Sequence, residues 1–72
     1  MAFELRYREG GKLVHTYASE GAALAFVRDV VRVGGREQAA QFSLDERNER
    51  GEVRTIAVGP PLVQRALEDR AE

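Results

Sequence analysis

The sequence contains no cysteine and no tryptophan, and only one histidine and two prolines among its 72 residues. Without cysteine the chain can form neither a disulfide nor a thiolate metal site. A small core must then stabilise the fold without a covalent or metal cross-link, and a homo-oligomer would add the missing burial. We expect no metal and no cofactor, because neither a metal-ligand spacing nor a nucleotide-binding glycine motif is present.

The sequence also lacks a long apolar run and an excess of one charge. Its longest apolar run, Ala22 to Val27, is far shorter than the about 20 residues of a membrane-spanning helix. The first residues show no basic segment followed by an apolar stretch, so we expect a cytoplasmic protein without membrane contact. A net charge of -1 disfavours a protein held to nucleic acid by its overall field.

The residues that are present indicate one globular domain over residues 1–72, with 43% hydrophobic and 32% charged residues. Phe3 to Arg8 alternates apolar and charged residues, which predicts a strand with one face in water. Leu13 to Tyr17 is rich in β-formers and predicts a second strand. Gly10 and Gly11 between them can adopt positive φ and predict a hairpin.

The two glycines leave the hairpin register open. A two-residue turn would pair Tyr7 with Val14, whereas a three-residue loop would pair Tyr7 with Leu13 and Phe3 with Tyr17. We prefer the three-residue loop, because it gathers most apolar residues on one face. That face would carry Phe3, Leu5, Tyr7, Leu13, His15 and Tyr17, and the other Glu4, Arg6, Arg8, Val14 and Thr16.

A helix is predicted from Gly21 to Val33, with Ser19 as its N-cap and Gly34 and Gly35 at its end. Its apolar residues cover about half of the circumference, so we expect one buried face. The residues of this face are Ala22, Ala23, Leu24, Phe26, Val27, Val30, Val31 and Val33.

The stretch from Gln38 to Glu46 is ambiguous, because its first residues favour a helix while Ala40, Phe42 and Leu44 alternate as in a strand. We expect a strand from about Ala39, since Val53 to Val58 is a clear strand that needs an antiparallel neighbour. A Glu49 to Gly51 loop would give the pairs Leu44–Ile56, Phe42–Val58 and Glu46–Arg54. The prolines after Gly59 introduce a last helix, from Leu62 to about Ala71.

These elements predict an α+β sandwich of two layers in the order ββαββα, with a four-stranded, mainly antiparallel sheet and two helices on one face. The topology repeats at an offset of 40 residues, which aligns Gly11 with Gly51. Val14, with Val53 and Ala57, would lie among charges on the open sheet face. That face or an edge strand is the expected contact with a second copy or another protein.

Two groups of residues are candidate sites. His15 is placed near Tyr7 and Tyr17, where a pocket would form, but a lone imidazole lacks a second catalytic group, and a histidine satisfied by a hydroxyl or by water is the better interpretation. A basic stripe along the first helix recurs every four residues, at Arg28, Arg32 and Arg36. Positive charge there suits the end of the helix dipole, and the alternative is contact with phosphates or an acidic partner.

We therefore expect a non-enzymatic binding or regulatory module that acts through protein–protein contacts, as a homodimer. Two alternatives stay open: a nucleic-acid-associated factor that uses the arginine stripe, and a small enzyme or ligand carrier centred on His15. The run Ser19 to Val31, with the hairpin before it and Leu44 to Arg47 and Ile56 to Gly59 after it, resembles small uncharacterised ββαββα-type proteins of high-GC bacteria. The resemblance covers most of the chain and implies a bacterial cytoplasmic protein, but no activity, cofactor or site residue.

Overall fold

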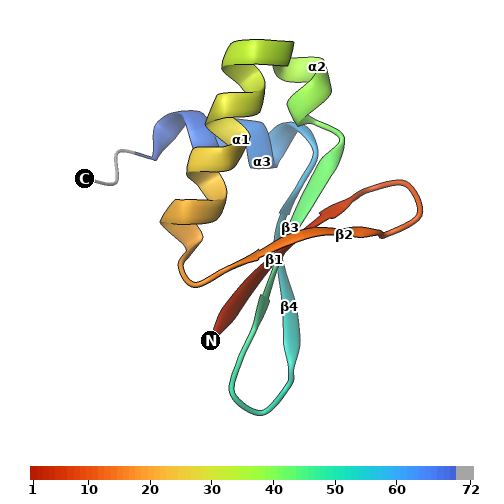
Figure 1. The fold of residues 1–72 in the computed structure, drawn as a ribbon, viewed down its shortest axis with the longest axis vertical. Helices are drawn as coiled ribbons and strands as arrows, with labels where there is room; N and C mark the ends of the chain where they lie inside the picture. The colour runs from red at the N-terminus through yellow and green to blue at the C-terminus, as the bar shows by residue number, and fades with distance from the viewer. Residues whose placement is uncertain (70–72) are drawn as a thin grey trace.

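The sheet consists of two hairpins whose first strands pair at its centre. The computed structural model describes residues 1–69. Its elements are β1 (Ala2–Tyr7), β2 (Leu13–Tyr17), α1 (Glu20–Gly34), α2 (Arg36–Ala39), β3 (Phe42–Arg47), β4 (Val53–Val58) and α3 (Pro60–Glu68). The strand order is β2-β1-β3-β4, and each neighbouring pair is antiparallel (Figure 1). The predicted α+β fold in the order ββαββα is confirmed, with the single-turn helix α2 as an addition.

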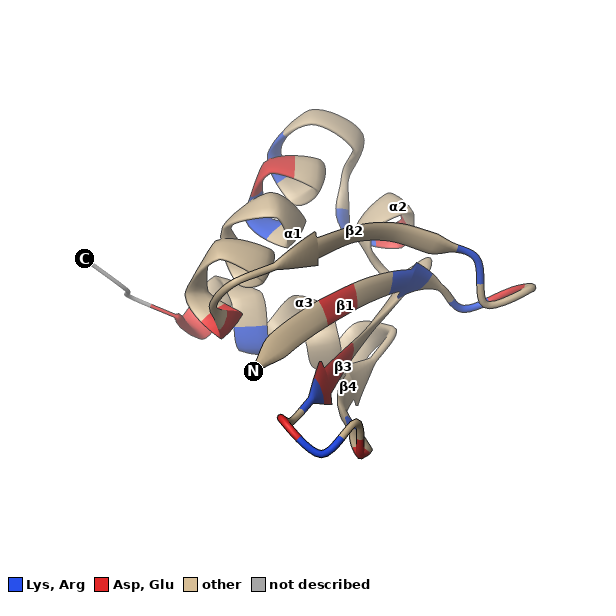
Figure 2. Ribbon diagram, turned by 60° about the horizontal axis from the view of Figure 1, so that its bottom comes forward, with Lys and Arg blue, Asp and Glu red and all other residues tan. Residues whose placement is uncertain are grey.

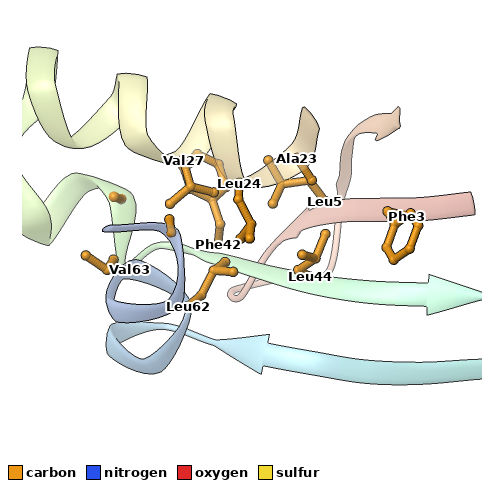
Figure 3. Packing of buried hydrophobic residues seen from close by; sticks show 11 residues of the cluster. Phe3, Leu5, Ala23, Leu24, Val27, Phe42, Leu44, Leu62 and Val63 are labelled. Atoms are coloured by element: carbon orange, nitrogen blue, oxygen red, sulfur yellow. The ribbon is translucent and has the colours of Figure 1, made fainter. Parts of the chain in front are cut away.

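The core lies between the sheet and the two longer helices. Leu5 of β1 and Leu44 of β3 pair with each other at the centre of the sheet, and both are fully buried. Onto them pack three residues of α1 and three of α3: Ala23, Leu24, Val27, Leu62, Val63 and Ala66 (Figure 3). Burial of each large aliphatic side chain contributes about 1.5–3 kcal/mol. The valine-rich α1 depends on this packing, because its valines lower its intrinsic helix propensity.

The two ββα halves correspond closely in the core. Because β1 and β3 are antiparallel and Leu5 faces Leu44, the central strands are related by an approximate twofold axis through this pair. That axis relates Phe3 to Phe42, both of which are buried. The three buried residues of α1 and the three of α3 are also 39 positions apart. The repeated topology thus has an offset of 39 residues in the core rather than the predicted 40.

A β-bulge at Val14 shifts the register of the first hairpin. Phe3 pairs with Tyr17 as the three-residue loop predicted, but Leu13 pairs with Arg6, so that the predicted Tyr7–Leu13 pair is wrong. A bulge inserts one unpaired residue and reverses the alternation of the side chains that follow it. Val14 therefore packs against the core, and Leu13 is 44% exposed, the opposite of the faces predicted for these two residues.

A second bulge, at Ile56, has the same effect in β4. Near the turn Glu46 pairs with Arg54 as predicted, and Gly51 closes the three-residue loop at a φ of 84°. Beyond the bulge the register shifts by one residue, to the pairs Leu44–Ala57 and Ser43–Val58. The predicted Leu44–Ile56 and Phe42–Val58 pairs are therefore wrong. Ile56 and Ala57 both pack against the core, so only Val53 of the predicted open-face residues in β4 lies on that face.

The prediction of a strand from about Ala39 is wrong by three residues. Residues 36–39 form α2, in which Ala39 is fully buried, and β3 begins at Phe42. The ambiguous stretch thus divides into a short helix followed by a strand. Its first part is helical because α2 places Ala39 in the core.

The ends of the longer helices follow the predicted signals closely. The Ser19 hydroxyl accepts a hydrogen bond from the Ala22 N–H at 3.2 Å, which caps the N-terminus of α1. α3 begins at Pro60, two residues before the predicted start, and ends at Glu68. The predicted end near Ala71 lies outside the described residues. Within residues 1–69, no helix combines the length and the apolar character needed to cross a membrane.

The bulge at Val14 gives a direct test of the register. Val14→Lys would place a charge against the core and should lower the free energy of unfolding by about 1–3 kcal/mol. Leu13→Lys, one residue earlier and half exposed, should change it by less than about 0.5 kcal/mol. Urea unfolding followed by circular dichroism measures both. If Leu13→Lys were the more destabilising change, the unbulged register would be correct.

Candidate interaction surfaces

The open face of the sheet carries a network of charged side chains centred on Glu4. One carboxylate oxygen of Glu4 accepts a hydrogen bond from Arg6 at 2.9 Å, and the other accepts one from Arg47 at 2.9 Å. Arg6 also approaches Asp45 at 3.9 Å, and the Thr55 hydroxyl donates to Asp45 at 2.9 Å. The network therefore joins β1, β3 and β4 across the face that the helices leave uncovered.

This network is already satisfied within the chain. Only 12% of the Glu4 side chain is exposed, and hydrogen bonds from Arg47 and then Arg6 lower the pKa of its carboxyl below the ordinary value of 4.5. The two guanidinium groups are further held by carbonyl oxygens of the two hairpin turns, Arg6 by Gly11 and Arg47 by Gly51. Figure 2 shows acidic and basic residues mixed along these strands and around the β3–β4 turn. A partner that covered this face would have to desolvate charges whose bonds are already made.

Arg28 of the predicted basic stripe connects α1 to the end of α3. Its Nη1 donates to the Ala66 carbonyl at 3.1 Å and to the Asp69 carbonyl at 3.3 Å, and it contacts the Asp69 carboxylate at 3.1 Å. The last carbonyls of a helix lack partners within the helix and carry partial negative charge, so a guanidinium there is stabilising. Arg28 therefore acts as a side-chain cap of α3.

The other two arginines of the stripe have other neighbours than Arg28. Arg32 is exposed and pairs with Asp29 on the same helix at 2.9 Å. Arg36 begins the short helix α2 and lines a hollow of about 260 Å³ between α2 and α3, together with Glu37, Ala40, Pro60, Val63 and Gln64. The structure thus places the three arginines in three different surroundings. The proposal of phosphate contact through them stays a prediction.

The backbone around the hollow between α2 and α3 offers few donors to an anion. Pro60 and Pro61 open α3 and have no N–H, and the next two N–H groups, of Leu62 and Val63, donate to the Gly59 carbonyl at 2.9 and 3.1 Å. The donors that bind anions at many helix N-termini are therefore absent or used here. In residues 1–69, no cluster of three or more His, Asp or Glu residues is placed to hold a metal ion.

The residues of the proposed His15 pocket belong to a row of neighbouring rings. The rings follow in the order Tyr7, Phe42, Phe26, Tyr17 and His15, with centroids 4.7–6.4 Å apart. His15 lies at one exposed end and Tyr7 at the other, with the two phenylalanines between. Burial raises the pKa of the Tyr17 hydroxyl, which makes it a weaker acid. The structure brings His15 and Tyr17 together, and the catalytic or ligand-carrying role stays a prediction.

The surface that the sequence did not reveal lies on the outer flank of α1. Val33 was predicted to be buried, but it is 84% exposed, and Ala22 is exposed as well. Phe26 and Val30 on the same flank are half-buried. The spacing of 26, 30 and 33 places these three side chains in one row along the helix. In Figure 1 the last turns of α1 extend beyond the strands, with α2 beside them.

The Glu4 network predicts a pH dependence of stability. Because the pKa of Glu4 is lower in the folded than in the unfolded chain, its contribution is present above pH 4.5 and is lost as the pH falls through the folded-state pKa. The urea midpoint of wild type should exceed that of Glu4→Gln at pH 7, and the difference should shrink toward pH 3. Glu49→Gln, in the exposed turn, is the control. A difference between wild type and Glu4→Gln that is equal at both pH values would contradict the role of the network.

The cap on α3 predicts different effects for two neighbouring arginines. Arg28→Ala removes a donor to two carbonyls and the ion pair with Asp69, and it should destabilise the fold by about 1–2 kcal/mol. Arg32→Ala removes only an exposed ion pair and should cost less than about 0.5 kcal/mol. Thermal unfolding of both variants measures the contrast. Equal effects would show that Arg28 is no more than a surface charge.

Comparisons of the chain with models of protein families, with curated proteins and with solved structures gave no match. The resemblance to small ββαββα-type bacterial proteins therefore stays an expectation from the sequence. The functional interpretation rests on the geometry of the surfaces described above.

Proposed function

We propose that the protein is a non-enzymatic binding module of the cytoplasm that acts through protein–protein contacts and forms a homodimer. One observation carries the proposal: charges of the open face are paired within the chain, while large apolar side chains remain in contact with water. Besides Met1, these exposed side chains are Tyr7, Leu13, Val33, Val53, Val58 and Leu67. Removing such apolar surface from water by contact with another protein lowers the free energy of the system.

The two other surfaces expected from the sequence are less suited to this contact. The open face would bury the Glu4 network against a partner, which costs desolvation without a new bond. Both edge strands, β2 and β4, carry a bulge, and a bulge interrupts the regular row of N–H and C=O groups that strand addition requires. Three of the exposed apolar side chains, Leu13, Val53 and Val58, lie on the open face, but contact there would also bury the Glu4 network. We therefore infer that the helix side, with Tyr7, Val33 and Leu67, is the contact surface.

The arginine stripe supports nucleic-acid binding less well than the apolar residues support protein contact. Arg28 and Arg32 already donate to acceptors in the chain, so phosphate contact would have to replace these bonds. The side chains of Asp29, Glu37 and Asp69 near the stripe add opposing charge. An electrostatic footprint for phosphates requires basic residues clustered without such acids.

The mass in solution tests the proposal. Light scattering at two protein concentrations, about tenfold apart, should show the mass of two chains at the higher one and a lower mean mass after dilution. The dimer should persist at high salt, because apolar contact is not screened. A monomer at both concentrations would overturn the proposed homodimer. Retention of a single-stranded DNA or RNA probe that is lost at high salt would then favour nucleic-acid binding instead.

A further inference from the structure

We propose that two copies of the chain associate through the outer flank of α1, with the two helices antiparallel about a twofold axis. The α1 seam comprises Phe26, Asp29, Val30, Arg32 and Val33. This inference rests on the proposed function and names the surface and the partner for it.

The position of Val33 is the first argument. Val33 has the largest exposed fraction of the large apolar side chains described, 84%, and it lies in a helix, where valine is less favourable than alanine, lysine or glutamate. In the single chain it therefore lowers helix stability without gaining burial. Phe26 and Val30 continue the row toward the core and are half-buried. A partner that covered the row would supply the burial that the single chain lacks.

The charges beside the row select a second copy as the partner. Asp29 lies next to the row and Arg32 lies beyond Asp29, with 64% and 75% of their side chains exposed. They pair with each other at 2.9 Å in the single chain and give the flank one acid and one base, which can exchange partners with a second copy. A uniformly basic or uniformly acidic partner would face one charge of opposite sign and one charge of its own sign on this flank. A copy turned by a twofold axis instead presents its base to the acid and its acid to the base.

One register satisfies both the charges and the apolar row. If the axis crosses the helices between residues 30 and 31, residue i of one copy is level with residue 61 − i of the other. Asp29 is then level with the second Arg32, and Val33 is level with residue 28, between the second Phe26 and Val30. The apolar side chains interdigitate in the same register that pairs the charges. In this register residues 27–34 of the two helices overlap, and Phe26 lies at the edge of the overlap.

Substitution at Val33 tests the surface. Val33→Glu should keep the fold and its urea midpoint, because the side chain is exposed in the single chain, and should raise the dimer dissociation constant at least about 100-fold. Val53→Glu, on the open sheet face, is the matched control and should leave the dissociation constant unchanged. If wild type is a dimer and Val33→Glu remains one, the seam is wrong while the proposed function stands. A monomeric wild type would overturn both the seam and the proposed homodimer. If wild type binds a different protein and Val33→Glu does not, that protein replaces the second copy as the partner.

A charge exchange tests the register. In a homodimer of Asp29→Arg, residue 29 and the facing residue 32 of the second copy are both arginines. In a homodimer of Arg32→Asp, both are aspartates. Each variant alone should therefore have a dimer dissociation constant at least about tenfold higher than that of wild type. An equimolar mixture should form heterodimers, since each arginine then faces an aspartate of the other copy. Light scattering of the separate variants and of the mixture measures this outcome. Failure of the mixture to dimerise better than either variant alone would overturn the antiparallel register.

Discussion

The buried pairing of Leu5 with Leu44 is the contact on which the rest of the structure depends. It joins the two hairpins into one sheet, and it places the apolar faces of β1 and β3 under both α1 and α3. Without this pairing each hairpin would be a two-stranded ribbon, which is marginally stable in water. The equal spacing of buried residues in the two halves follows from the same symmetry, because each helix packs on the strands from the same relative position.

The two bulges decide which apolar residues reach this core. Each lies in an edge strand and turns one additional apolar side chain, Val14 or Ile56, toward the helices. A chain of 72 residues has little surface to bury, so these two side chains matter to its stability. The same bulges make the edges irregular, which works against uncontrolled strand pairing. Stability and protection of the edges thus have one structural cause.

Charge pairing within the chain shapes the functional interpretation. Glu4 holds Arg6 and Arg47 on the open face, and Arg28 is held at the end of α3, so many of the charged groups act in the fold itself. The outer flank of α1 differs, because Val33 at the end of its apolar row is exposed and the ion pair of Asp29 with Arg32 is at the surface. Exposed apolar surface beside a self-complementary pair of charges is typical of contact between identical chains. This contrast between the surfaces is the basis of the proposed homodimer.

Local patterns in the sequence determined the element order, the Ser19 cap, the Gly51 turn and the two layers, because hydrophobic period, capping and turn chemistry act over a few residues. Only the tertiary structure decided the bulges, the division of residues 36–47 into α2 and β3, and the exposure of Val33. A strand pattern gives alternation but not the place where it is interrupted, and that place depends on which side chains fill the space under the helices. An apolar arc on a helix likewise shows which residues can be buried, while the length of the sheet beneath it decides which ones are.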